Sequence, residues 1–84
     1  MDIINEFNKC IINVKNIKNI SDDNKLYLYA YYKQSLFGNN DNVKPSIFNR
    51  VDMAKWKAWN SVKDISKEDA MKKYIQHVLF LEKI

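Results

Sequence analysis

The sequence of 84 residues predicts an all-α protein, a bundle of four helices that forms one domain over residues 1–84. Apolar residues recur at steps of three and four in four separate windows, as they do on one face of a helix. Gly38 and Pro45 are the only glycine and the only proline, so the turn residues that β-hairpins need are almost absent. Serine, aspartate and glycine also stand where the four helices would begin or end.

The first two windows predict helices from Asp2 to about Lys18 and from about Asp23 to Phe37. Ser21 or Asp22 can cap the second helix, and Gly38 fits the left-handed residue that ends it. The first helix carries an apolar stripe made of Ile3, Ile4, Phe7, Cys10, Ile11 and Val14.

A long polar connection over residues 39–49 separates the second helix from the third. Pro45 disfavours helix at Lys44, and the only adjacent apolar pair in this connection is Ile47–Phe48. A connection of this length in a small domain is either held down by its own apolar residues or carries function.

The last two windows predict helices from about Val51 to Val62 and from Ser66 to about Lys83. Ser66 and the three residues after it read as a capping box. The inward-facing residues would be Met53, Trp56 and Trp59 on the third helix, and Met71, Tyr74, Ile75, Val78 and Leu81 on the fourth. Four such helices with one long crossover form a bundle.

Composition excludes several classes of protein. The single cysteine, Cys10, rules out an intramolecular disulfide and fits a reducing compartment, so a cytoplasmic location is expected. We expect no signal peptide, no membrane span and no stable membrane insertion. Because His77 and Cys10 lie on different helices and no metal-ligand spacing is present, we expect neither an enzyme nor a bound cofactor or metal. The net charge of +4 favours anionic partners.

Lys33 does not fit a plain bundle. On a helical wheel it lies near the middle of an apolar sector that also holds Leu26, Tyr29, Ala30, Leu36 and Phe37. An ammonium group buried without a partner is costly, so an anion must meet Lys33, or its helix faces a groove. The alternative is that Lys33 extends past the edge of the core to water.

Other lysines and tyrosines could join Lys33 in one groove. Lys55 borders the apolar edge of the third helix, Lys15 borders Ile11, and Tyr74 lies within the stripe of the fourth helix. Ammonium groups and phenol donors gathered in this way suit a nucleotide and its phosphate. Taken singly, both lysines read as solvated surface charges, Tyr74 as a core residue and His77 as an exposed side chain.

Three segments resemble the acyl-CoA-binding protein family. Residues 26–34 (LYLYAYYKQ) are similar to its Tyr-x-x-Tyr-Lys-Gln signature, with Gly38 at the expected distance. Residues 54–60 (AKWKAWN) resemble its Lys-Trp-x-Ala-Trp segment, and residues 66–75 (SKEDAMKKYI) resemble its Ser-x-Glu-Asp-Ala-Met-x-x-Tyr-Ile segment. The motifs stand in the family's order and cover about residues 22 to 81.

The resemblance implies an up-down-down-up bundle with the long crossover between helices 2 and 3. It implies an intracellular, monomeric carrier and pool former in lipid metabolism that binds medium- to long-chain acyl-CoA esters reversibly and with high affinity. Acyl-CoA is then a ligand, not a cofactor, and no reaction is performed on it.

The resemblance also implies roles for single residues. Lys33 and Lys55 would pair with the 3′-phosphate of the nucleotide, and Tyr29 would donate a hydrogen bond to it. Tyr32 would pack against the adenine, and Tyr74 would close the nucleotide pocket. The other implied binding residues are Ala30, Tyr31 and Lys15, and the acyl groove would be edged by Phe7, Ile11, Leu26 and Leu28.

This chain departs from the family pattern around the start of the third helix. The family has a basic residue at the position of Val51, and Arg50, one position earlier, either replaces that charge or points elsewhere. Two other readings of the chain stay open at this stage, a small basic helical nucleic-acid-binding module and a protein-interaction module.

Overall fold

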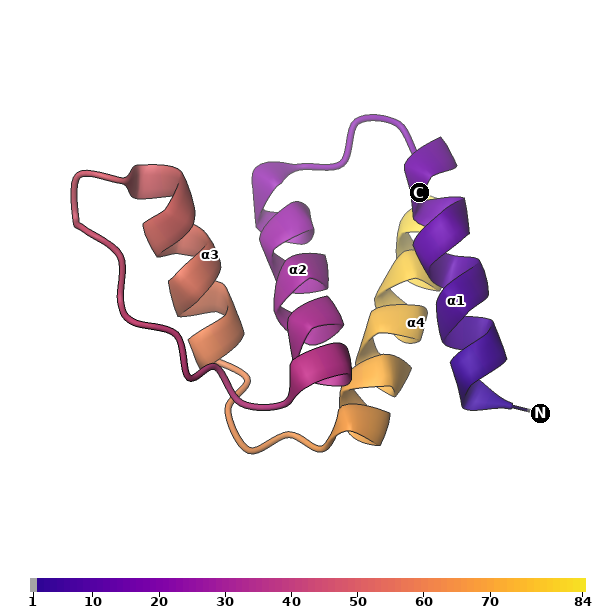
Figure 1. Ribbon diagram of the computed structural model, residues 1–84. Coiled ribbons are helices and arrows are strands. Elements are labelled where there is room, and N and C mark those ends of the chain that lie inside the picture. The colour runs from indigo at the N-terminus through magenta and orange to yellow at the C-terminus, as the bar shows by residue number, and fades with distance from the viewer. Residues whose placement is uncertain (1) are drawn as a thin grey trace.

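The computed structural model describes residues 2–84 and shows four α-helices side by side (Figure 1). The elements are α1 (Ile3–Asn13), a short 3-10 helix η1 (Val14–Asn16), α2 (Asp22–Phe37), α3 (Arg50–Asn60) and α4 (Lys67–Lys83). The described residues contain no strand. The all-α prediction is confirmed, and the helix boundaries agree with the predicted ones to within a few residues except at the end of the first helix.

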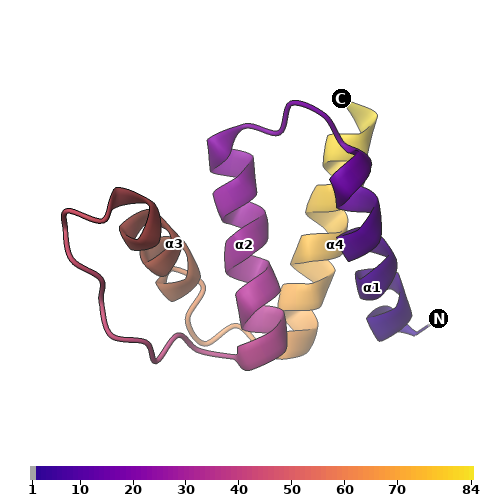
Figure 2. The ribbon, with the colours of Figure 1, turned by 45° about the horizontal axis from the view of Figure 1, so that its top comes forward.

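The helices run up, down, down and up, as the resemblance implies (Figure 1). Across the molecule their order is α3, α2, α4, α1, and α2 packs against α3 on one side and α4 on the other (Figures 1 and 2). The extents of 39 × 28 × 15 Å describe a flat arrangement. Because α2 lies between two neighbours, it presents side chains to both of them.

The caps that the sequence predicts are formed. The Ser21 hydroxyl accepts a hydrogen bond from the Asn24 N–H at 3.2 Å, and the Ser66 hydroxyl accepts one from the Asp69 N–H at 3.1 Å. Gly38 ends α2 with φ +76° and ψ −149°, and its N–H donates to the Gln34 carbonyl. This backbone conformation is one that residues with a side chain rarely adopt, so glycine is needed there.

The first helix is shorter than predicted. Its α-helical part ends at Asn13, a single 3-10 turn follows, and Ile17 is extended. Asn13 and Asn16 explain the early end, because asparagine side chains compete with helical hydrogen bonding.

The buried face of α2 also differs from the predicted one. Leu36 and Phe37, expected on the apolar face, are exposed. The buried residues of α2 are Leu28, Ala30, Gln34 and Ser35. Because α2 is covered on two sides, its buried residues do not form a single apolar stripe. The sector around Lys33 that the helical wheel predicted to be buried is therefore partly exposed to solvent.

Two clusters of buried side chains make up the core. The larger lies between α1, α2 and α4 and contains Phe7, Cys10, Leu28, Tyr74, Val78 and Leu81. The smaller lies between α2 and the end of α3 and contains Ala30, Trp59 and Val62. The interface between α2 and α3 therefore has its own small core.

Tryptophan side chains hold the crossover between α2 and α3. The Trp56 Nε1–H donates to the Asn42 carbonyl at 2.9 Å, and the Trp59 Nε1–H donates to the Gly38 carbonyl at 2.9 Å. The apolar pair Ile47–Phe48 is exposed and does not hold the segment down. Hydrogen bonds from the indole groups of Trp56 and Trp59 hold the crossover in place instead.

His77 is not the exposed side chain that the pattern suggests. It is half-buried on α4, where its Nε2 lies 2.8 Å from Asn24 Oδ1 and its ring stacks on Tyr27 at 4.0 Å. With Nε2 as the donor and Asn24 Oδ1 as the acceptor, this contact joins α4 to the first turn of α2.

We expect acidification to weaken the fold through His77. Burial lowers the pKa of His77 from its usual 6.5. As the pH falls below 6.5, His77 therefore binds a proton more readily in the unfolded chain than in the folded one. The stabilisation is complete above pH 6.5 and is lost as the pH falls through the lowered pKa. Urea unfolding of the protein and of His77→Gln at pH 7.5 and at acidic pH measures this. Equal losses in both proteins on acidification would assign the effect to other groups.

Candidate functional site

Tyr29 lies between two hollows in the surface. The first, here the aromatic hollow, has a volume of about 270 Å³ and is lined by Val14, Ile20, Lys25, Leu28, Tyr29, Tyr32 and Tyr74. The second, here the crossover hollow, has a volume of about 190 Å³ and is lined by Tyr29, Asn42, Val43, Pro45, Asp52, Lys55, Trp56 and Trp59. Tyr29 is shared by both.

The aromatic hollow is built on a cluster of rings from three helices. The ring centroids of Tyr32 and Tyr74 are 6.2 Å apart, and Phe7 lies against both, at 6.3 Å from Tyr32 and 5.2 Å from Tyr74. Phe7 is 1% exposed. Phe7 therefore lies in the core beneath the two tyrosines and is not among the residues that line the aromatic hollow.

Two ammonium groups flank the Tyr29 ring. The Lys33 Nζ is 5.9 Å from the centroid of the ring, and the Lys55 Nζ is 5.6 Å from it. Lys33 also lies over Phe37 at 4.6 Å and over Trp59 at 5.2 Å. These rings give partial compensation for a half-buried charge through cation–π attraction. Lys33 is thus neither fully buried nor free in water.

Neither lysine is in an ion pair within residues 2–84. The ion pairs in this part of the chain are Lys9–Glu6 and Lys72–Asp69, which are both at the surface. Asp52 lines the crossover hollow together with Lys55, and its carboxylate accepts a hydrogen bond from Asn49 Nδ2 at 2.7 Å. Two cations therefore lie beside Tyr29 without a direct carboxylate partner, and they can receive an anion.

Tyr29 and Tyr74 are hydrogen-bond donors at neutral pH. Burial raises the pKa of Tyr74 to about 12. Burial also raises the pKa of Tyr29, and the negative charge of Asp52 adds to this effect. Both phenols therefore keep their protons well above neutral pH and can donate them to an anionic acceptor.

Three predicted residues of α2 lie on its other side. Leu26 and Tyr31 line a hollow of about 340 Å³ on the opposite face of α2, between that helix and the end of α3. Ala30 also borders this hollow, and it is buried against Trp59. The structure therefore does not bring these three residues to the aromatic hollow.

The remaining predicted residues lie at the border of the site. Lys15 is exposed in η1, next to Val14, but is not among the residues that line the aromatic hollow. Ile11 is half-buried against the larger core cluster. Arg50 is exposed in the first turn of α3 and does not line the crossover hollow.

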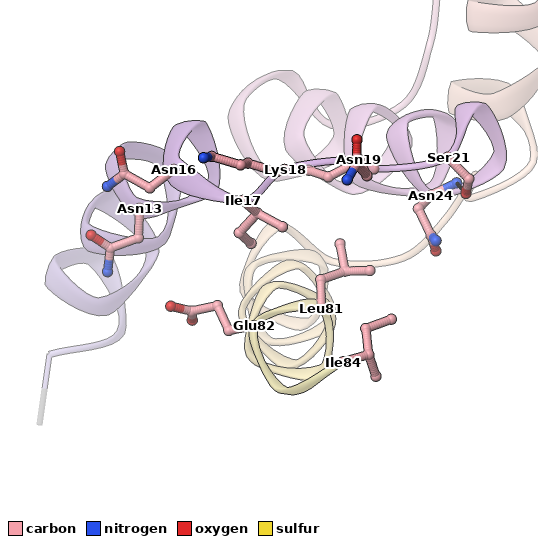
Figure 3. Close-up of a pocket in the computed structure, with 11 residues that line it drawn as sticks. Asn13, Asn16, Ile17, Lys18, Asn19, Ser21, Asn24, Leu81, Glu82 and Ile84 are labelled. Carbon is pink, nitrogen blue, oxygen red and sulfur yellow. Dashed lines mark hydrogen bonds between the residues drawn. The ribbon is translucent and has the colours of Figure 1, made fainter.

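A larger cavity lies between the α1–α2 connection and the C-terminal end of α4, and its lining includes none of the predicted site residues (Figure 3). Its volume is about 860 Å³. Its apolar lining residues are Ile17, Ile20, Leu81 and Ile84. Asparagine side chains and the side chains of Lys18 and Glu82 line its polar part (Figure 3). It lacks the paired ammonium groups and the phenols of the Tyr29 site.

Gln34 is important for the site and was not singled out from the sequence. It is buried, and its Nε2 donates to the Ile65 carbonyl at 2.8 Å and to Asn39 Oδ1 at 2.9 Å. Its Oε1 accepts a hydrogen bond from Trp59 Nε1 at 3.2 Å. These contacts fix α3 against α2, and so set the position of Lys55 relative to Tyr29. The only sequence signal for Gln34 was its position in the Tyr-x-x-Tyr-Lys-Gln signature, and that position does not indicate what Gln34 does.

Two classes of feature are absent from residues 2–84. No three histidine, cysteine, aspartate or glutamate side chains in this range gather closely enough to hold a metal ion. In the same range no helix combines the length and the apolar character that crossing a bilayer requires.

Comparison with known proteins relates the whole bundle to one family. The family model described as acyl CoA binding protein matches residues 5–78. The chain is 54% identical over 55 residues to the acyl-CoA-binding protein of Saccharomyces cerevisiae, a match that covers 66% of this chain and 63% of that protein, slightly less than two thirds of its length. It is 43% identical over 74 residues to the acyl-CoA-binding protein homolog of Drosophila melanogaster, covering 87% of this chain and 86% of that protein.

A solved structure matches the fold over almost its full length. The crystal structure of Oryza sativa acyl-CoA-binding protein 2 superimposes with a TM-score of 0.94 at 38% sequence identity, and the match covers 98% of this chain and 92% of that one. The match includes α3 and the long crossover that precedes it, so the elements around Tyr29 are shared.

Proposed function

Since this chain belongs to the acyl-CoA-binding protein family, we propose that it binds medium- to long-chain acyl-CoA esters reversibly and carries them unchanged. In this role it forms an intracellular pool of acyl-CoA for lipid metabolism. The single cysteine supports a reducing compartment, the cytoplasm, as its place of action. We propose that it acts as a monomer and does not bind nucleic acid.

The arrangement of Lys33, Lys55 and Tyr29 carries this proposal. Two cations lie beside the ring of one phenol, and neither is in an ion pair within residues 2–84, which suits a phosphate group better than a neutral ligand. The 3′-phosphate of the ester would accept a hydrogen bond from the Tyr29 hydroxyl and pair with both ammonium groups. Each such contact to a charged group contributes about 1.5–3 kcal/mol.

The adenine would occupy the aromatic hollow. Tyr32 supplies a ring for it to pack against, and Tyr74 closes the hollow from α4. Lys15, in the exposed turn that follows Val14, would approach the nucleotide from the rim.

The acyl chain needs apolar surface beside the head group. Leu28 lines the aromatic hollow, and Ile11 packs nearby on the same core cluster, so these two residues remain our candidates for the groove. Each buried methylene contributes about 0.8 kcal/mol, so two additional carbons would strengthen binding roughly tenfold until the groove is filled.

Titration calorimetry with palmitoyl-CoA, free CoA and palmitate tests the proposal. One ester should bind per chain, and more tightly than either fragment, because head group and acyl chain use one site. The absence of ester binding to the folded protein would reject the carrier function, and binding of oligonucleotides with a steep salt dependence would favour the nucleic-acid alternative.

Tyr29→Phe should weaken binding of palmitoyl-CoA about tenfold, since the hydroxyl donor is lost while the ring beside both lysines remains. The matched control is Tyr27→Phe on the same helix, because Tyr27 faces His77 on the other side of α2. Calorimetry of the two variants gives the comparison. An equal loss in both would show that the Tyr29 hydroxyl does not contact the ligand.

A further inference from the structure

The start of α3 presents an exposed apolar surface that the proposed function does not use. We call Ile47, Phe48 and Val51 the apolar tip. Phe48 is 90% exposed, Ile47 73% and Val51 64%. Exposed large apolar side chains that stand close together in the sequence can form a contact surface.

Backbone hydrogen bonds hold the tip in place. The Asn49 N–H donates to the Ser46 carbonyl at 3.0 Å, and the Phe48 N–H donates to the Ser46 hydroxyl at 3.2 Å. The Asn49 side chain then caps α3 by accepting from the Asp52 N–H. Because this turn is closed by its own hydrogen bonds, Ile47 and Phe48 are directed outward by ordered backbone.

Basic residues outnumber acidic ones in the segment that carries the tip, although one of them, Lys55, belongs to the Tyr29 site. Residues 41–57 contain four basic side chains and two acidic ones, which are Lys44, Arg50, Lys55 and Lys57 against Asp41 and Asp52. Lys44 and Arg50 flank the turn in the sequence. The Asp52 carboxylate is bonded to Asn49 Nδ2, which reduces its pairing with nearby lysines.

The tip lies at an outer edge of the molecule. The crossover and the first turn of α3 are on the side of α2 that is remote from α4 and α1, so no other helix covers them (Figures 1 and 2). A flat partner can therefore reach the tip without displacing any part of the bundle.

We propose that the apolar tip docks the protein reversibly on an anionic lipid surface. Ile47 and Phe48 enter the boundary between head groups and acyl chains, and the flanking Lys44 and Arg50 pair with lipid phosphates and carboxylates. This contact is peripheral and involves no spanning segment. This proposal rests on the proposed function, because the contact would bring the Tyr29 site to the lipid surface into which acyl-CoA esters partition.

Vesicle sedimentation tests the contact with phosphatidylcholine vesicles prepared with and without phosphatidylserine. The protein should bind the phosphatidylserine vesicles, less so at high salt, and the double variant Ile47→Ser/Phe48→Ser should bind about tenfold more weakly. The matched control, Ile4→Ser/Ile12→Ser, removes two exposed isoleucines from α1 and should leave binding unchanged. Lys44→Gln/Arg50→Gln should remove most of the preference for phosphatidylserine.

Three outcomes would overturn the proposal. The first is that the protein sediments with neither vesicle. The second is that the tip double variant and the α1 double variant bind equally. The third is self-association of the protein in sedimentation velocity that only the tip variant loses. The last result would identify a second copy of this chain as the occupant. Palmitoyl-CoA calorimetry of the unsubstituted protein is read separately, so failure of acyl-CoA binding alongside intact vesicle binding would reject the proposed function alone.

Discussion

Replacing Gln34 by alanine should lower the free energy of unfolding by about 3 kcal/mol. The change leaves a cavity between α2 and α3 and removes the hydrogen bonds to Asn39, Ile65 and Trp59. Trp59 Nε1 keeps its bond to Gly38 and Asn39 Oδ1 keeps the Asp64 N–H, so the protein should still fold. Urea unfolding followed by circular dichroism measures the loss.

The control for this variant is Gln76→Ala, in which an exposed glutamine on α4 is replaced by the same residue. It should change stability by less than about 0.5 kcal/mol. Gln34→Leu separates the two causes, because it restores most of the volume without the hydrogen bonds. A loss below about 1 kcal/mol for Gln34→Ala would mean that the contacts of Gln34 do not hold α3 in place.

Lys33→Gln should weaken palmitoyl-CoA binding by about 10- to 100-fold. The substitution keeps the length of most of the side chain but removes the charge that lies beside the Tyr29 ring. With one cation fewer at the site, the salt dependence of binding should also become shallower. Calorimetry at two salt concentrations measures both effects.

Lys63→Gln is the matched control, since Lys63 is exposed in the turn after α3 and lines neither hollow. Lys33→Arg should recover part of the affinity because it restores the charge. Thermal unfolding of Lys33→Gln checks the fold, since its cation–π contacts contribute only about 0.5–1 kcal/mol each. Equal affinities of Lys33→Gln and Lys63→Gln would remove Lys33 from the site.

The helices could be predicted from sequence because their ends are set locally. Ser21, Gly38 and Ser66 cap helices through hydrogen bonds to residues three or four positions away, which a linear pattern contains. The end of α1 at Asn13 was not predicted correctly, because it depends on the weak helix-disfavouring preference of several asparagines. No single residue marks that end.

The buried face of α2 could not be predicted in the same way. A wheel assumes one buried side, whereas α2 is packed on two sides and buries Gln34 and Ser35 through specific hydrogen bonds. Leu36 and Phe37 were misassigned for this reason. Burial of a polar residue depends on partners distant in sequence, such as Ile65 and Trp59, and a local pattern does not contain them.

The candidate site was predicted in part. Lys33 was selected as a charge near the middle of an apolar sector and Lys55 as a charge at an apolar edge, and the structure places both beside Tyr29. Lys55 reaches Tyr29 only because α2 and α3 run parallel after the long crossover, which the family resemblance implied and the residue pattern alone did not. Phe7 was assigned to the acyl groove through the family resemblance, and the structure places it in the core against Tyr32 and Tyr74.

The order of the helices divides the bundle into parts of unequal cooperativity. α3 packs on α2, whereas α4 lies between α2 and α1 with the larger core cluster, so we expect α3 to open locally more readily than α4. Local opening of α3 separates Lys55 from Tyr29 and abolishes the paired charges. We therefore expect a ligand that bridges Lys33 and Lys55 to protect the backbone amides of α3 from exchange more than those of α1 or α4, and to make this edge helix part of the cooperative unit.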